Sequence, residues 1–293
     1  MCLIAFAIGA RPDLPLVIAS NRDEQWSRPT QALQAWALPS GKQVYSGRDL
    51  QAGGTWIGMA QDGRVAMLTN VRDGKPDIAP RSRGDLVTGW LDSGANWEDW
   101  LRRFEPQLYG GFNLVLGDLA CGRWAWISNR TSSAEPKPGL GAAGAGSQAM
   151  PAGWLGHELA PGLYGLSNAA LDTPWPKTVA LKRALGRHLD AGARADDSGD
   201  LLAALLDRVP APDAELPATG IALAVEKAVS SAFVHVPEMS YGTRSSLLVH
   251  WHADGKLDAR EWTHAARPAA DHRPDRWPLD DSRYSALAAM TLA

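Results

Sequence analysis

Residues 2–24 read CLIAFAIGARPDLPLVIASNRDE and contain two apolar runs, 2–10 and 14–20, separated by a short turn. Apolar runs of this length, bounded by glycine and proline, are typical of buried strands. So short a connection predicts that the two strands pair as an antiparallel hairpin. The polar segment 20–24 then ends the second strand beside Cys2, which opens the first.

Further strand and helix patterns follow along the chain. Strand pairs are expected at 55–59 with 64–71, 112–119 with 123–128 and 245–251 with 256–263, with a single strand at 163–167. Helices are expected at 84–92, 96–105, 174–189, 201–208 and 221–234, with Asn96 as an N-cap. A polar stretch containing Pro29 separates the first two hairpins. Because this order lacks regular βαβ alternation, we expect an α+β fold of antiparallel sheets covered by helices.

The domain organisation follows from composition. The chain has 293 residues, of which 45% are hydrophobic, enough for a large core. We expect a single domain over 1–265. Residues 136–153 are rich in Gly, Ala and Pro and predict a mobile loop or insertion. The polar, proline-rich stretch 266–293 predicts a loosely docked tail.

Charge and hydropathy exclude several functions. The 29 basic and 32 acidic residues give a net charge of −3, which leaves no field to attract nucleic acid. No apolar run approaches the roughly 20 residues needed to span a bilayer, and the opening run lacks the features of a secretory signal. With only Cys2 and Cys121, a disulfide framework is not expected. We predict a cytoplasmic protein that binds neither nucleic acid nor membrane.

Cys2 is the first candidate for chemistry. Removal of Met1 would place a thiol and a free α-amine on one residue. An α-amine titrates near about 7.7–8.0, so it can take the thiol proton at neutral pH. Nucleophile and base would then share a residue. A small buried apolar cysteine is the alternative interpretation.

Polar residues at strand ends are the second group of candidates. A carboxylate in the segment 20–24 could orient a charged α-amine. Asn70 and Asn168 each follow an apolar strand, and their amides could stabilise an oxyanion. Arg244 precedes the apolar run 247–249 and suggests an anionic partner, because a buried Arg needs one. Each of these residues could equally be a solvated turn residue.

Eight segments, in order, carry a family resemblance: MCLIAFA, SNRDEQWSRP, GGTWIGM, VAMLTNVRD, SRGDLV, GGFNLVLGD, YGLSNAALDTPWPK and YGTRSSLLV. Together they resemble the NRDE family, that of transport and Golgi organization protein 2 in eukaryotes, over about residues 1–265. That family is similar to the N-terminal nucleophile hydrolases of the choloylglycine hydrolase and penicillin V acylase type. The resemblance implies a four-layer αββα sandwich in which an N-terminal Cys, exposed by Met excision, attacks an amide.

The resemblance also implies site residues. Those that match catalytic positions of the acylases are Cys2, Asp23, Asn70, Asn168 and Arg244. The substrate-binding candidates are Asn21, Arg22, Trp56 and Arg72. The acylases carry an Arg three residues before the aspartate, where this chain has Ser20 with Arg22 nearby. Arg72 belongs to a basic loop that could receive an anionic group of a substrate.

Two functions are therefore in view. The first is an N-terminal-Cys amidohydrolase acting on a non-peptide C–N bond of a small metabolite, without a cofactor. The second is binding or trafficking of haem, a lipid or acyl-CoA in the same cavity, with haem as a carried ligand. A purely structural adaptor has the weakest support, since it leaves the strand-end polar residues without a use.

Two other motifs carry less weight. Residues 139–144 fit G-x-G-x-x-G, but they follow Pro-Lys-Pro rather than a strand, so no dinucleotide site is expected. His250 and His252 flank Trp251 on one face of a strand and could begin a metal site. We expect instead an outward-facing pair on an edge strand, and no metal.

Overall fold

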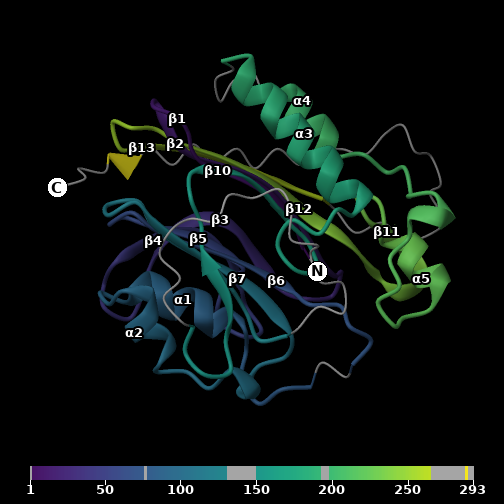
Figure 1. Ribbon diagram of the computed structural model, residues 1–293, viewed down its shortest axis with the longest axis horizontal. Coiled ribbons are helices and arrows are strands. Elements are labelled where there is room, and N and C mark those ends of the chain that lie inside the picture. The colour runs from purple at the N-terminus through teal and green to yellow at the C-terminus, as the bar shows by residue number, and fades with distance from the viewer. Residues whose placement is uncertain (1, 76–77, 131–149, 193–197, 265–287, 290–293) are drawn as a thin grey trace.

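The computed structural model describes residues 2–75, 78–130, 150–192, 198–264 and 288–289. Two antiparallel sheets lie face to face, with helices on the outer side of each (Figure 1). The first sheet has the order β10-β1-β2-β12-β13-β14, and β11 also pairs with β12. The second has the order β3-β4-β5-β6-β7-β8-β9. The four-layer αββα arrangement expected from the sequence is confirmed.

The strands of the first sheet are β1 (Cys2–Arg11), β2 (Leu14–Gln25), β10 (Gly162–Leu166), β11 (His235–Val236), β12 (Tyr241–Trp251), β13 (Lys256–Thr263) and β14 (Ala288–Ala289). Those of the second are β3 (Thr30–Ala37), β4 (Gln43–Asp49), β5 (Ile57–Ala60), β6 (Arg64–Asn70), β7 (Phe112–Asp118), β8 (Arg123–Ser128) and β9 (Leu155–Glu158). The α-helices are α1 (Gly84–Asp92), α2 (Trp97–Leu101), α3 (Pro176–Asp190), α4 (Gly199–Leu205) and α5 (Leu223–Ala228). None of these helices is long and apolar enough to cross a membrane.

Strand β1 lies inside the first sheet and is buried on both faces. Ile4 and Phe6 pack into the core between the sheets, whereas Leu3 and Ala5 pack under α3 and α4. Successive side chains of a strand point to opposite faces, so both faces need apolar residues. This explains the unbroken apolar run at the start of the chain.

The outer helices each complete a core of their own. On the second sheet, α1 and α2 contribute Leu86, Trp90 and Trp100 to one cluster. On the first sheet, α3 and α4 contribute Leu181 and Leu201 to another. The sheets therefore share one inner core and have separate outer cores.

Most element predictions are confirmed. The 2–24 hairpin forms with Cys2 opposite Arg22. Helix α1 spans the predicted residues, and the Asn96 side chain caps α2 by accepting a hydrogen bond from the Asp99 N–H at 2.8 Å. The hairpins β7–β8 and β12–β13 also form.

Other predictions are wrong or incomplete. Of the helix expected over 221–234, only α5 forms. The backbone after α5 makes hydrogen bonds outside a helix, since the Phe233 N–H donates to the Asp207 carbonyl. The polar stretch around Pro29 contains β3 and β4. As an edge strand with one buried residue, Leu33, β3 carries little apolar pattern.

Two predicted segments fall largely outside the described residues. Most of the loop expected at 136–153 lies in 131–149, and most of the tail expected at 266–293 lies in 265–287 and 290–293. The described part of the tail is β14, where Ala288 and Ala289 pair with Leu257 and Lys256 of β13.

The expected outward pair of histidines is wrong. Strand β12 lies between β2 and β13, not at an edge, because the first hairpin covers its other side. His250 is 1% exposed, and its Nε2 lies 2.9 Å from the Nε2 of His188 on α3. Similarly, the Nε2 of His264 lies 2.9 Å from the Ser246 hydroxyl.

These histidines should make stability depend on pH. Burial lowers the pKa of His250 and that of His264 to about 4 each. Between about pH 6.5 and 4 the unfolded chain binds protons that the folded chain does not, so stability falls as pH falls. Each histidine contributes at most about 1.4 kcal/mol per pH unit in this range.

We expect H250Q and H264Q to flatten this dependence, measured by urea unfolding between pH 4.5 and 7. The control is Q51N, at an exposed position with no titratable group, which should keep the wild-type slope. A wild-type slope in both H250Q and H264Q would contradict the assignment.

Candidate functional site

Cys2 opens β1 on the face that packs between the two sheets, and it is 6% exposed. Its neighbour across the hairpin is Arg22, whose guanidinium lies 4.1 Å from the ring centroid of Trp56. Arg22 also donates a hydrogen bond to the Thr30 hydroxyl at 3.2 Å. The thiol therefore lies beside a buried cation held against an indole.

Gly47 makes room for this stack. A Cβ at Gly47 would lie 2.5 Å from the Trp56 ring, closer than atoms can approach. The glycine lets the indole of Trp56 lie over β4, beneath Arg22.

Asp23 lies on the opposite face of β2, toward the helices. It pairs with Thr243 of β12, whose hydroxyl donates to the Asp23 carboxylate at 2.7 Å. Asp23 follows the residue that faces Cys2, so it lies next to the start of β1, and its charge acts on the Cys2 thiol.

Lys177 is a buried cation that we did not predict. It lies in the first turn of α3, is 6% exposed, and donates a hydrogen bond to the Val229 carbonyl at 2.8 Å. One signal for it exists in the sequence: Lys177, Leu181 and Leu185 share the buried face of α3 at helical spacing. A lysine on such a face needs a partner or a function.

The two predicted asparagines join the sheets. The Asn168 side-chain amide, after β10, donates to the Asn70 carbonyl at the end of β6 at 2.9 Å. The Arg72 N–H donates to the Asn168 carbonyl at 2.8 Å, and the Thr69 hydroxyl donates to the Ser167 carbonyl at 2.6 Å. We call residues 69–72 and 167–168 the inter-sheet junction. The Ser167 hydroxyl also donates to the Cys2 carbonyl at 3.2 Å, which ties the junction to Cys2.

Asn21 and Arg244 bind the scaffold around the site. Asn21 faces the helices, and its amide donates to the carbonyls of Leu205 and Ala232 at 2.7 and 2.9 Å. Arg244 lies at a shift of register in β12, where its guanidinium donates to the carbonyls of Gln25 and Trp26, both at 2.9 Å. The structure places both side chains against backbone carbonyls, not against the Cys2 thiol.

Arg72 is also buried rather than solvated. Its guanidinium lies 2.8 Å from the Glu226 carboxylate of α5 and 4.6 Å from the ring centroid of Trp175. Glu226, which we did not predict either, neutralises it. Within the described ranges, no group of three or more His, Cys, Asp or Glu side chains is placed to hold a metal ion.

The electrostatics of the site are set mainly by burial. Burial raises the pKa of the Cys2 thiol, the Asp23 carboxylate adds to this, and the Arg22 guanidinium opposes it. Burial also raises the pKa of Asp23, against the opposing charge of Lys177. Burial lowers the pKa of Lys177 to about 8, again opposed by Asp23. Asp23 and Lys177 therefore stabilise each other's charged forms.

Comparison with known proteins shows to which family the chain belongs. The family model for Transport and Golgi organisation 2 matches residues 1–266. The chain belongs to this family. The resemblance inferred from the eight motifs is thus confirmed, and the strand ends, the junction and Lys177 all lie inside the matched region.

Relatives match across most of their length. The human Transport and Golgi organization protein 2 homolog is 32% identical over 275 residues, 89% of this chain and 92% of its own. The mouse homolog is 30% identical over 299 residues, 97% of this chain and 99% of its own. The Drosophila melanogaster protein is 32% identical over 133 residues, 39% of this chain and 45% of its own.

Two solved structures are similar at lower levels. A Caenorhabditis elegans ortholog of N-acylethanolamine-hydrolyzing acid amidase has a TM-score of 0.43 and 11% identity, covering 70% of this chain and 86% of its own. A mutant conjugated bile acid hydrolase from Clostridium perfringens has a TM-score of 0.47 and 6% identity, covering 97% of each chain. These similarities are too low to assign roles to residues.

Replacing Lys177 should change the titration of Asp23. In K177M the ammonium that opposes the raised pKa of Asp23 is gone, so this pKa should rise further. Carbon-13 NMR of the Asp23 carboxyl across a pH titration measures the change. The control is K182M, which removes another ammonium of α3, one that pairs with Asp172. It should leave the pKa of Asp23 unchanged. An Asp23 pKa that is equal or lower in K177M would contradict the electrostatic coupling.

Proposed function

We propose that removal of Met1 makes this protein an N-terminal-cysteine amidohydrolase that cleaves an amide bond of a small acylated metabolite. The observation that carries the proposal is the position of Cys2. It opens a central strand, with Arg22 directly opposite and the Asp23 carboxylate one residue beyond. A free α-amine on Cys2 would therefore meet a carboxylate in a buried environment.

The chemistry uses the thiol and amine of Cys2 together. The α-amine accepts the thiol proton as the sulfur attacks the amide carbonyl carbon, and the proton passes to the leaving amine as the C–N bond breaks. Water then cleaves the thioester, releasing a carboxylic acid and restoring the thiol. Asp23 orients the charged amine, and Arg22 favours the thiolate.

Stabilisation of the tetrahedral intermediate falls to Asn168. Its amide has two N–H donors, one of which bonds the Asn70 carbonyl. The second remains for a developing oxyanion. In this proposal Asn70 acts through its carbonyl, by holding the Asn168 amide in place.

A second candidate is binding and trafficking of haem, a lipid or acyl-CoA without bond cleavage. It is supported by the raised pKa of the Cys2 thiol, which disfavours the thiolate, and by the guanidinium of Arg22, which lies over the Trp56 ring. Stacked cations and indoles suit planar or anionic ligands. Both cysteines are free thiols, which supports a reducing compartment such as the cytoplasm for either function.

Loss of Met1 and labelling of the new N-terminus test the hydrolase. Intact mass analysis should find a chain that begins at Cys2, and iodoacetamide should alkylate Cys2 with loss of turnover on a panel of acyl amides. C2A should lower turnover by at least about 1,000-fold, comparable to loss of other nucleophiles. C121A, at an exposed thiol, is the control and should retain full turnover.

The C2A variant distinguishes the two proposed functions. A purified protein that retains Met1, or a C2A variant with wild-type turnover, would refute the hydrolase. Wild-type and C2A proteins that bind haem or acyl-CoA equally, with no cleavage of any amide, would favour the binding protein. Tryptophan fluorescence is the readout, since the chain has 13 Trp.

A further inference from the structure

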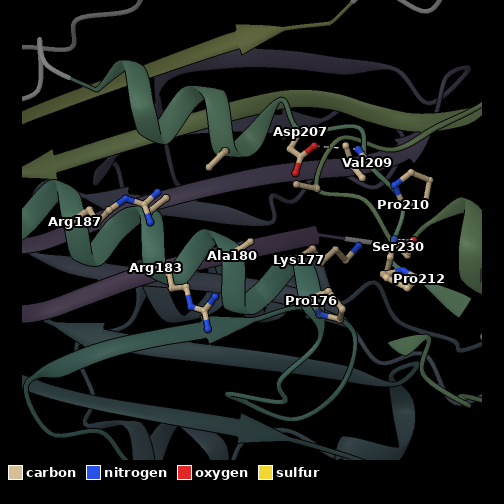
Figure 2. A pocket seen from close by; sticks show the side chains of 14 residues that line it. Pro176, Lys177, Ala180, Arg183, Arg187, Asp207, Val209, Pro210, Pro212 and Ser230 are labelled. Atoms are coloured by element: carbon tan, nitrogen blue, oxygen red, sulfur yellow. Dashed lines mark hydrogen bonds between the residues drawn. The ribbon is translucent and has the colours of Figure 1, made fainter. Parts of the chain in front are cut away.

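A pocket of about 440 Å³ opens on the helical layer outside the first sheet. It lies between α3, α4 and the segments 207–212 and 230–232 (Figure 2). The Cys2 side chain is on the other face of β1, toward the second sheet. The pocket is therefore a different place from the Cys2 site, although Lys177 lines its wall.

The charges around the pocket are mostly positive. Among the described residues that line it, three carry positive charge, Lys177, Arg183 and Arg187, and one carries a carboxylate, Asp207. That carboxylate accepts a hydrogen bond from the Val209 N–H at 3.0 Å, drawn as a dashed line in Figure 2. The surplus of cations predicts attraction for an anion.

The two arginines of the pocket lie on one helix, α3. Arg183 and Arg187 project from successive turns of α3, and both are exposed (Figure 2). Like charges at i and i+4 destabilise a helix. Among the described residues neither arginine has an ion pair within 4.0 Å, although other arginines of this chain do, such as Arg72. An anion between the guanidiniums would remove the repulsion.

Lys177 adds a buried donor at the inner wall. In Figure 2 its side chain runs from α3 toward Ser230. Its ammonium has three N–H donors, and one bonds the Val229 carbonyl. Its positive charge adds to the attraction of the pocket for an anion.

The rest of the lining is small and apolar. These residues are alanines and prolines with one valine, among them Ala180, Ala184, Val209 and Pro210. Short side chains leave a broad apolar surface beside the charges. A ligand that fits both parts has an anionic group joined to an apolar body.

We propose that this pocket binds an organic phosphate, a phosphomonoester with a small apolar group. At pH 7 such a phosphate carries about 1.5 to 2 negative charges, which match two guanidiniums better than a single carboxylate does. Guanidiniums bind phosphate oxygens in a bidentate way. The phosphoryl group lies between Arg183 and Arg187, and its apolar group contacts the alanines and prolines.

Isothermal titration calorimetry of the full chain with phenyl phosphate tests the pocket. We expect saturable binding, weakened at least tenfold in R183E/R187E. The matched control is R103E, at an exposed arginine of the other helical layer, which should bind as the wild type does. Circular dichroism should confirm that the variants are folded.

Two further probes decide the ligand class. Inorganic phosphate should bind at least tenfold more weakly than phenyl phosphate, because it has no apolar group. Benzoate should also bind more weakly, because it carries one charge. No saturable binding of phenyl phosphate, equal binding of either probe, or wild-type affinity in R183E/R187E would each overturn the proposal. None of these outcomes depends on whether Cys2 is a nucleophile.

Discussion

The hydrogen bonds of the inter-sheet junction are the constraint on which the site depends. Most of the contact between the two sheets is the apolar inner core, and apolar contacts are not directional. At the junction, side chains of Thr69 and Asn168 bond backbone carbonyls of the opposite sheet. Asn113 of β7 adds a third bond, its amide donating to the Ala169 carbonyl at 2.8 Å. These directional bonds hold the end of β6 beside the start of β1.

The two faces of the first hairpin divide the charges of the site. Arg22 lies between the sheets with Cys2, whereas Asp23 lies toward the helices with Lys177. Consecutive residues of a strand face opposite sides of the sheet. Arg22 and Asp23 therefore place one charge on each side of the sheet, next to the first residue of β1. In the proposed hydrolase, the Cys2 thiol faces the charges between the sheets, and its α-amine lies next to Asp23.

The local features of this fold could be predicted from the sequence, and the tertiary ones could not. Asn96 caps a helix and the 2–24 hairpin forms because those preferences act over a few residues. Strand β3 was not predicted because it is the edge strand of the second sheet and most of its residues are not buried. The pattern of apolar residues does not identify such a strand. The Leu33 N–H of β3 bonds the Glu261 carboxylate of β13, a partner 228 residues away.

The same limit applies to the candidate site. The motif resemblance identified Cys2, Asp23 and Asn168, whose surroundings in the structure are buried and polar. It could not indicate that Arg72 is neutralised by Glu226, because that pair joins a loop to a distant helix. Nor could the resemblance indicate that Arg244 binds backbone carbonyls at the end of β2 rather than the Cys2 thiol.

The register shift in β12 has an evolutionary consequence. Thr243 pairs with Asp23 and Ser245 with Arg22, so Arg244 is an extra residue without a partner on β2. Deleting Arg244 would close the bulge and leave Thr243 opposite Asp23, but it would remove the guanidinium that donates to the carbonyls of Gln25 and Trp26. Homologous chains without this extra residue should therefore provide another donor for these two carbonyls.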